Sequence, residues 1–168
     1  MKKGFTLIEL LIYVALTSAV VVAFISFSLT MFQARSKAAV HQEINANARF
    51  AMEYITDAIR GSSGVNLGGS TFSSDPGVLE LSMADVAKNP TVIELTADNG
   101  QIQITEGATG PIIVMPTLVS VTNLQFTNLT GNGRVENVRV QMTLQYSGTD
   151  SAEYATSQTY QTAVSVRR

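Results

Sequence analysis

Residues 1–13 read MKKGFTLIELLIY, so two lysines and a glycine precede a long apolar run. Between Phe5 and Phe32 the only charged side chain is Glu9, and the run contains neither proline nor glycine. A helix that is apolar all round is typical of a membrane span. A carboxylate costs about 2.5–3.5 kcal/mol at the centre of a bilayer, so the position of Glu9 indicates a functional role.

The composition bounds the class of protein. The 168 residues are enough for one domain and a terminal extension. Charged residues make up 14%, against about 25% in ordinary soluble domains. The net charge of −2 provides no basic patch for direct contact with nucleic acid. Cysteine is absent, which leaves the redox compartment open.

Two simple interpretations explain the apolar run only in part. A cleavable secretory signal could end near Ala19, but the apolar run continues to Phe32 and disfavours a cut there. A plain membrane anchor fits the length, because about 20 apolar residues span the hydrocarbon core. Lys2 and Lys3 would then hold the N-terminus in the cytoplasm and leave the body outside. Neither interpretation explains Glu9 or the glycine.

Residues 3–11, KGFTLIELL, closely resemble the leader and start of type IV pilins and pseudopilins. The resemblance implies that a prepilin peptidase cuts after Gly4 on the cytoplasmic side and methylates the new amino group of Phe5. The glutamate of the family, at the fifth position of the mature chain, corresponds to Glu9. The likeness is strong over about thirty residues. Beyond them, only the order of the predicted helix and the β-rich body is similar.

Physical chemistry adds a reason for each residue of this motif. Gly4 has no side chain to obstruct a protease. Cleavage would give Phe5 a cationic amine one helical turn from Glu9, and unlike charges attract strongly in a poorly hydrated site. We therefore predict that Glu9 pairs with the Phe5 amine of a neighbouring subunit. A pair within one subunit, or a Glu9 that reaches the headgroups, is the alternative.

The helical pattern continues beyond the apolar run. Residues 33–60 contain no glycine or proline, and Gly61 supplies a stop. A single helix from about residue 6 to residue 60 would be roughly 80 Å long. Apolar side chains recur at steps of three or four and form one stripe that needs burial: Val40, Ile44, Ala48, Ala51, Ile55 and Ile59.

The remainder of the chain is predicted to be β-rich. Residues 61–76 have the composition of a loop, and a hairpin turn is expected at 98–100 and a bulge near Asn123. The predicted fold class is α+β, with one or two antiparallel sheets packed on the helix stripe, as in pilins. The expected strands are 78–83, 92–96, 101–105, 112–115, 119–129, 135–146 and 154–166.

Three segments follow from these patterns. Residues 1–4 form the expected cytoplasmic leader, and residues 5–34 the transmembrane and assembly helix. Residues 35–168 form the expected globular domain, which combines helix 35–60 with the β-rich body.

We find no sequence pattern of an enzyme. His41 has no carboxylate or thiol at ligand spacing, which favours a solvated histidine on a helix face over a catalytic base. The scattered acids Asp75, Asp85 and Asp98 lack the dense pattern of a calcium loop. No cofactor or metal is therefore expected, and the chain is not expected to be an enzyme.

A looser resemblance concerns the subgroup. Residues 47–60, which end in Asp57-Ala58-Ile59-Arg60, are similar to the stem end of J-type minor pseudopilins and W-type minor pilins. The resemblance implies a minor subunit that initiates or caps a type IV pilus or type II secretion pseudopilus. A major pilin, or a membrane-tethered extracytoplasmic binding or adhesion domain, is the alternative.

The same resemblance implies partners and a location. The partners are the prepilin peptidase, other pilin or pseudopilin subunits, and an inner-membrane assembly platform driven by a cytoplasmic ATPase. The expected location is the cytoplasmic (inner) membrane as a single-pass protein, followed by an extracytoplasmic filament.

Overall fold

A computed structural model describes residues 4–98, 100–115, 119–131, 136–147 and 156–167. The chain divides into two compact units, Met1–Ala39 and Val40–Arg168. The helix α1 (Leu7–Gly61) provides the first unit and opens the second. Its bounds lie within one residue of the predicted ones, as different assignments of a helix end commonly do.

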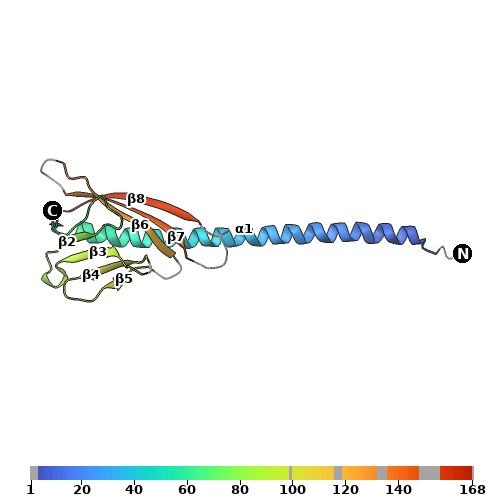
Figure 1. The fold of residues 1–168 in the computed structure, drawn as a ribbon, viewed down its shortest axis with the longest axis horizontal. Coiled ribbons are helices and arrows are strands. Elements are labelled where there is room, and N and C mark those ends of the chain that lie inside the picture. The colour runs from blue at the N-terminus through green and yellow to red at the C-terminus, as the bar shows by residue number, and fades with distance from the viewer. Residues whose placement is uncertain (1–3, 99, 116–118, 132–135, 148–155, 168) are drawn as a thin grey trace. The chain divides into compact units, whose positions relative to one another are not determined.

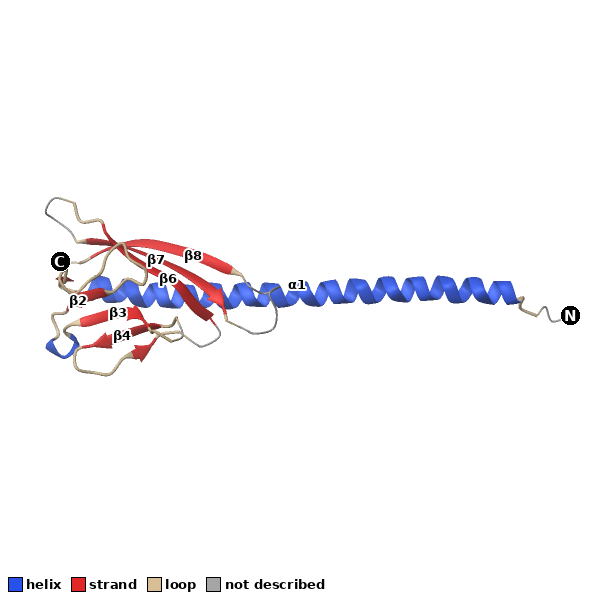
Figure 2. Cartoon of the chain, in the orientation of Figure 1, coloured by secondary structure: helices blue, strands red, loops and turns tan. Residues whose placement is uncertain are grey.

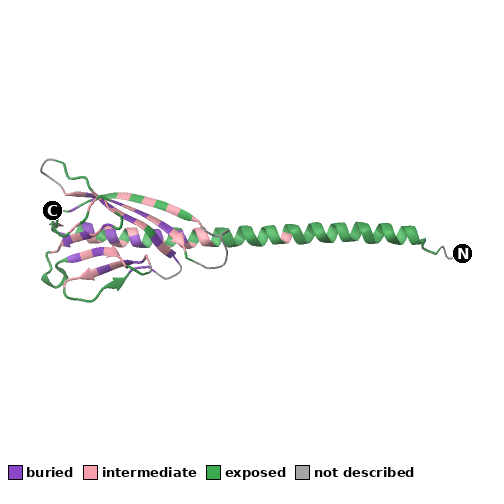
Figure 3. Cartoon of the chain, in the orientation of Figure 1, coloured by how far each residue is buried: buried purple, intermediate pink, exposed green. Residues whose placement is uncertain are grey.

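The second half of α1 carries the predicted apolar stripe. Five stripe residues are fully buried, and Val40 is partly buried at the edge of the core. Their spacing of three or four residues keeps them on one face of the helix, which the strands cover (Figure 3). The buried members are Ile44, Ala48, Ala51, Ile55 and Ile59.

Two antiparallel sheets supply the other side of this core (Figure 2). The first sheet has the order β1-β2-β3-β4-β5, and the second the order β6-β7-β8. The first comprises β1 (Gly64–Val65), β2 (Leu79–Ser82), β3 (Thr91–Leu95), β4 (Ile102–Glu106) and β5 (Ile112–Ile113). The second comprises β6 (Val119–Asn128), β7 (Asn137–Tyr146) and β8 (Ser157–Ser165).

In both sheets, residues that face the core alternate along the strands with residues that face outward. In β7 the buried residues are Val138, Val140, Met142 and Leu144, and the residues between them are more exposed. A helix packed on antiparallel sheets confirms the predicted α+β class.

Some local predictions are confirmed and others are wrong. The register of β6 against β7 shifts between Val121 and Asn123, where a bulge was expected. The expected loop 61–76 contains the short strand β1, and the 3₁₀ helix η1 (Val86–Lys88) was not predicted. The hairpin prediction includes Asn99, which lies outside the described residues, while Gly100 has the expected positive φ of 57°.

Candidate processing and assembly site

The candidate site is the start of α1, where Thr6 caps the helix. The Glu9 N–H donates to the backbone oxygen of Thr6 at 3.1 Å and lies 3.4 Å from its hydroxyl oxygen. The Leu10 N–H also donates to the Thr6 carbonyl, at 3.2 Å. Thr6 thereby satisfies backbone donors that the first turn of a helix leaves unpaired. The sequence analysis missed this role, although Thr6 and Glu9 have the Thr-x-x-Glu spacing of a capping box.

Gly4 and Phe5 precede the helix and are exposed. A Cβ atom added at Gly4 would meet no heavy atom within 4 Å. The Phe5 ring lies against the Tyr13 ring, with centroids 6.0 Å apart and planes tilted by 60°. The backbone between Gly4 and Phe5 therefore lies outside regular structure and is open to approach.

Glu9 lies in the first turn of α1 and is exposed. Its backbone N–H is engaged by Thr6, but within the described ranges its carboxylate has no hydrogen-bond or ion-pair partner. A negative charge at this end of a helix is favoured by the helix dipole. Glu9 thus presents an exposed carboxylate in the first turn of α1, and this carboxylate is not bonded to another described side chain.

Hydroxyl groups within the apolar run donate hydrogen bonds to backbone carbonyls of α1 itself. Thr17 donates to the Tyr13 carbonyl at 2.7 Å, and Ser26 donates to the Val22 carbonyl at 3.0 Å. Thr30 makes the same bond to the Ser26 carbonyl. Such bonds satisfy a polar side chain without water, which the interior of a bilayer or a packed filament requires.

The first half of α1 is long and apolar enough to cross a membrane. Its most apolar 18-residue window has a mean hydropathy of 2.5, and none of that window is buried within the chain. Among the described residues, α1 is the one helix with these properties. An exposed apolar surface of this size requires lipid or other protein around it.

His41 is half-buried rather than solvated as predicted. Gln158 Nε2 lies 3.1 Å from His41 Nδ1, and the Tyr160 hydroxyl lies 2.5 Å from Asn45 Oδ1 and also bonds the Gln158 side chain. Burial raises the pKa of Tyr160. These four side chains join α1 to β8 and have the character of a packing contact between helix and sheet.

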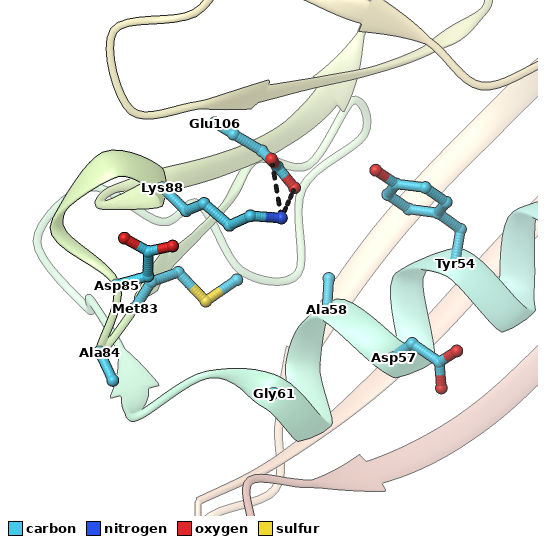
Figure 4. A pocket seen from close by; sticks show the side chains of 9 residues that line it. All are labelled: Tyr54, Asp57, Ala58, Gly61, Met83, Ala84, Asp85, Lys88 and Glu106. Atoms are coloured by element: carbon cyan, nitrogen blue, oxygen red, sulfur yellow. Dashed lines mark hydrogen bonds and ion pairs between the residues drawn. The ribbon is translucent and has the colours of Figure 1, made fainter.

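A cavity of about 500 Å³ lies between α1 and the loop that carries η1. Figure 4 shows Lys88 and Glu106 on one side and Tyr54 and Ala58 of α1 on the other. Lys88 Nζ lies 3.1 Å from Glu106 Oε2, and the hydrogen bond and charge of Glu106 raise the pKa of Lys88. The Glu106 carboxylate thus stabilises the charged form of the Lys88 amine.

Residues 1–25 match a family described as the prokaryotic N-terminal methylation motif. No curated protein and no solved structure matches the chain. The match covers Gly4, Phe5, Thr6 and Glu9, of which Thr6 and Glu9 are hydrogen-bonded at the start of α1. This motif and the long apolar helix support a pilin-like chain that is processed as a prepilin, methylated and anchored once in a membrane. The motif implies a structural subunit rather than an enzyme.

Proposed function

We propose that this chain is the precursor of a subunit of a type IV pilus or type II secretion pseudopilus. The observation that carries the proposal is the methylation motif of residues 1–25, which ends within a helix that is apolar and exposed. Prepilin peptidase removes residues 1–4 and methylates Phe5. Residues 5–34 then anchor the chain in the inner membrane, and residues 35–168 form the extracytoplasmic body.

The filament supplies the environment that the apolar half of α1 lacks. Exposed side chains such as Leu11 and Phe24 are 57% and 70% accessible in the isolated chain. Removing an apolar side chain of this size from water stabilises by about 1.5–3 kcal/mol, whether lipid or protein then surrounds it. Packing many such helices together replaces lipid with protein. An assembly platform and its cytoplasmic ATPase drive the transfer.

Cleavage and methylation can be tested at the mature N-terminus. Mass spectrometry of the chain from a host with prepilin peptidase is expected to find methylated Phe5 as the first residue. Gly4→Val is expected to block processing while the body stays folded, because no described residue lies within 4 Å of a Cβ atom added at Gly4. An intact Met1 in the wild-type chain, or a cut near Ala19, would refute the proposal.

Glu9 is the residue that we propose for docking between subunits. Its carboxylate pairs with the methylated amine of Phe5 in a neighbouring subunit and neutralises both charges within the apolar filament core. The exposed position of Glu9 and the short distance along the chain to Phe5 support this role. A buried charge that loses its partner costs about 3–5 kcal/mol, so a subunit without this pair should dock poorly.

The docking role predicts a separation of processing from assembly. Glu9→Val is expected to be cleaved and methylated normally but to enter filaments many-fold less often than the wild-type chain. Glu53→Val is a matched control, because Glu53 is an exposed glutamate in the second half of α1. Normal incorporation of the Glu9→Val subunit would exclude the pairing.

We further propose that the chain is a minor subunit that starts or caps the filament. The likeness of residues 47–60 to J-type and W-type minor subunits supports this role. Quantitative mass spectrometry of purified filaments is then expected to find the chain far below the amount of the principal subunit. Equal or greater abundance would identify it as a major pilin instead.

A further inference from the structure

The two sheets of the described chain have four outer edges, formed by β1, β5, β6 and β8. An edge strand presents unpaired N–H and C=O groups, which can pair with a strand from another chain. Native proteins usually block such edges with bulges, charges, proline or covering loops. The four edges of this protein differ in how they are treated.

The β6 edge is covered by the chain itself. The Gly77 N–H donates to the Leu124 carbonyl at 2.7 Å, and Ser73 N–H donates to the Phe126 carbonyl at 2.8 Å. The Asp75 carboxylate accepts from the Leu124 N–H at 3.1 Å. A bulge interrupts the same strand. These contacts leave no continuous row of groups for another strand.

The β1 edge is also closed. This strand has only two residues, and the outward N–H of Val65 donates to the Glu136 carboxylate at 2.6 Å. The carboxylate of Glu136, the residue that precedes β7, thus occupies the position that a partner strand would need.

As far as the structure describes the chain, the β8 edge is open along its nine residues. The Val166 N–H donates to the Glu136 carbonyl, so the even-numbered residues of β8 bond to β7 and the odd-numbered residues point their backbone groups outward. Within the described ranges, the outward N–H and C=O groups have no partner, and each residue that carries them is exposed: Ser157, Thr159, Gln161, Ala163 and Ser165.

Nothing in β8 guards this edge. Residues 157–165 contain no charged residue, no proline and no glycine, and their register against β7 is unbroken. A long, regular and uncharged edge is a template for strand addition.

The β5 edge is short and apolar, and Pro111 immediately before it has no N–H, so the outward N–H at this edge is that of Ile113. Ile112 and Ile113 are 52% and 54% exposed although they lie on opposite faces of the strand. The Val114 N–H donates to the Ile102 carbonyl at 2.9 Å, so the backbone groups of Ile113 point away from β4. Both isoleucines would lose water if another strand covered this edge.

We propose that β8 of one subunit pairs with β5 of a second copy of this chain. Figure 1 shows β8 and β5 along opposite margins of the β body, and the two strands run in opposite directions. Two copies in the same orientation would therefore form an antiparallel ladder between the β8 edge and the β5 edge. A contact between two different edges joins adjacent copies head to tail. It therefore requires at least two adjacent copies of this chain, either within a tip complex or along a filament of which the chain is the principal subunit.

The backbone restricts the register of this ladder. Ile113 can pair only with an odd-numbered residue of β8, because only those residues direct their backbone groups outward. The proposal rests on the proposed function in one respect, the common orientation of neighbouring subunits. The hydrogen bonds within each subunit remain unchanged.

Cysteine pairs can test the ladder, because the natural chain contains no cysteine. A full-length chain with Ile113→Cys would be co-expressed with a second chain that carries cysteine at position 157, 159, 161, 163 or 165. Mild oxidation of membranes or filaments is expected to give a disulfide-linked dimer for one of these positions or a neighbouring pair. Ala46→Cys, at an exposed helix position, is the control partner and should give no such dimer.

Each outcome decides the proposal. A dimer that needs both cysteines supports the contact between β8 and β5. A dimer from Gln161→Cys alone would indicate pairing between two β8 strands and overturn the proposal. Cross-links to a different protein, or no cross-link at any of the five positions, would overturn it as well.

A proline at the free edge provides a second test. Gln161→Pro removes an outward N–H that the fold does not use, whereas Thr162→Pro removes a bond to β7. Gln161→Pro is expected to keep the thermal stability near wild type and to reduce the cross-link several-fold. Unchanged cross-linking with a folded Gln161→Pro chain would refute the ladder. Methylation of Phe5, measured on the same samples, reports the proposed function separately.

Discussion

The two halves of α1 carry similar apolar side chains that meet different surroundings. Ile55 is fully buried by the sheets, whereas Ile12 is 59% exposed. The chain therefore supplies its own apolar environment to the second half, and the first half depends on lipid or neighbouring subunits. Apolar residues within one continuous helix thus serve either folding or assembly, according to the half in which they lie.

The polar side chains of the two halves differ in the same way. Thr17 and Ser26, in the first half, bond to carbonyls of their own helix. His41 and Asn45, in the second half, reach side chains of β8. Local bonds suit a helix that changes neighbours between membrane and filament, because they survive the exchange. Bonds to β8 hold one fixed tertiary arrangement.

The largest difference between the two halves of α1 is expected when the same substitution, isoleucine to aspartate, is made in each half. Ile55→Asp is expected to cost at least about 4 kcal/mol, because it places an unpaired carboxylate in the core. Ile12→Asp should leave the body stable but weaken membrane insertion, by less than the roughly 2.5–3.5 kcal/mol that aspartate costs at the centre of a span, because Ile12 lies near one end. Chemical unfolding of the full chain in detergent and carbonate extraction of membranes measure the two effects.

The two readouts should respond to different substitutions. Ile55→Asp is expected to remain in the membrane fraction, and Ile12→Asp is expected to unfold like the wild-type chain. Equal loss of body stability in both variants would show that both halves of α1 contribute to the folding of the body, contrary to the comparison.

Two neighbouring alanines test the comparison within the second half. Ala48 is fully buried and Ala46 is exposed. Ala48→Leu is expected to destabilise by about 1–3 kcal/mol, because added carbons in a packed core force side chains to shift. Ala46→Leu should change stability by less than about 0.5 kcal/mol, since alanine and leucine have similar helix propensities. Urea unfolding curves of the two variants provide the measurement. A larger effect at Ala46 would contradict the described packing.

The helix and the main strands could be predicted because their signals are local. Steps of three and four between Ile44 and Ile59 and alternation along β7 fix which faces are apolar. The bulge at Asn123 was legible as a change of phase. Gly4, Phe5 and Glu9 were identified from spacing and resemblance, and their roles stay predictions.

The missed features depend on residues far apart in the sequence. The edge of β1 is closed by Glu136, about seventy positions later. The edge of β6 is closed by the loop 73–77, about fifty positions earlier. No local pattern distinguishes such a covered edge from the open edge of β8. The 3₁₀ helix η1 is short and capped by Asp85, whose side chain accepts from Ala87 N–H. It lacks the periodicity on which longer helices are recognised.

The smallest expected effect concerns the contact between α1 and β8. Tyr160→Phe removes the hydroxyl that lies 2.5 Å from Asn45 Oδ1. The loss of this bond is expected to lower the free energy of unfolding by about 0.5–1.5 kcal/mol at neutral pH. Tyr13→Phe is the control in the first half of α1, where the tyrosine is exposed and the body should be unaffected.

The same variant should alter the alkaline dependence of stability. Burial raises the pKa of Tyr160 above its unfolded value of about 10, so the folded chain holds this proton more tightly. The stabilisation is complete below about pH 10 and is lost as the pH rises through the folded pKa. Urea unfolding at neutral pH and near pH 10.5 should show a steeper alkaline loss for the wild-type chain than for Tyr160→Phe. Parallel loss in both chains would indicate that Tyr160 ionises as freely in the folded body as in the unfolded chain.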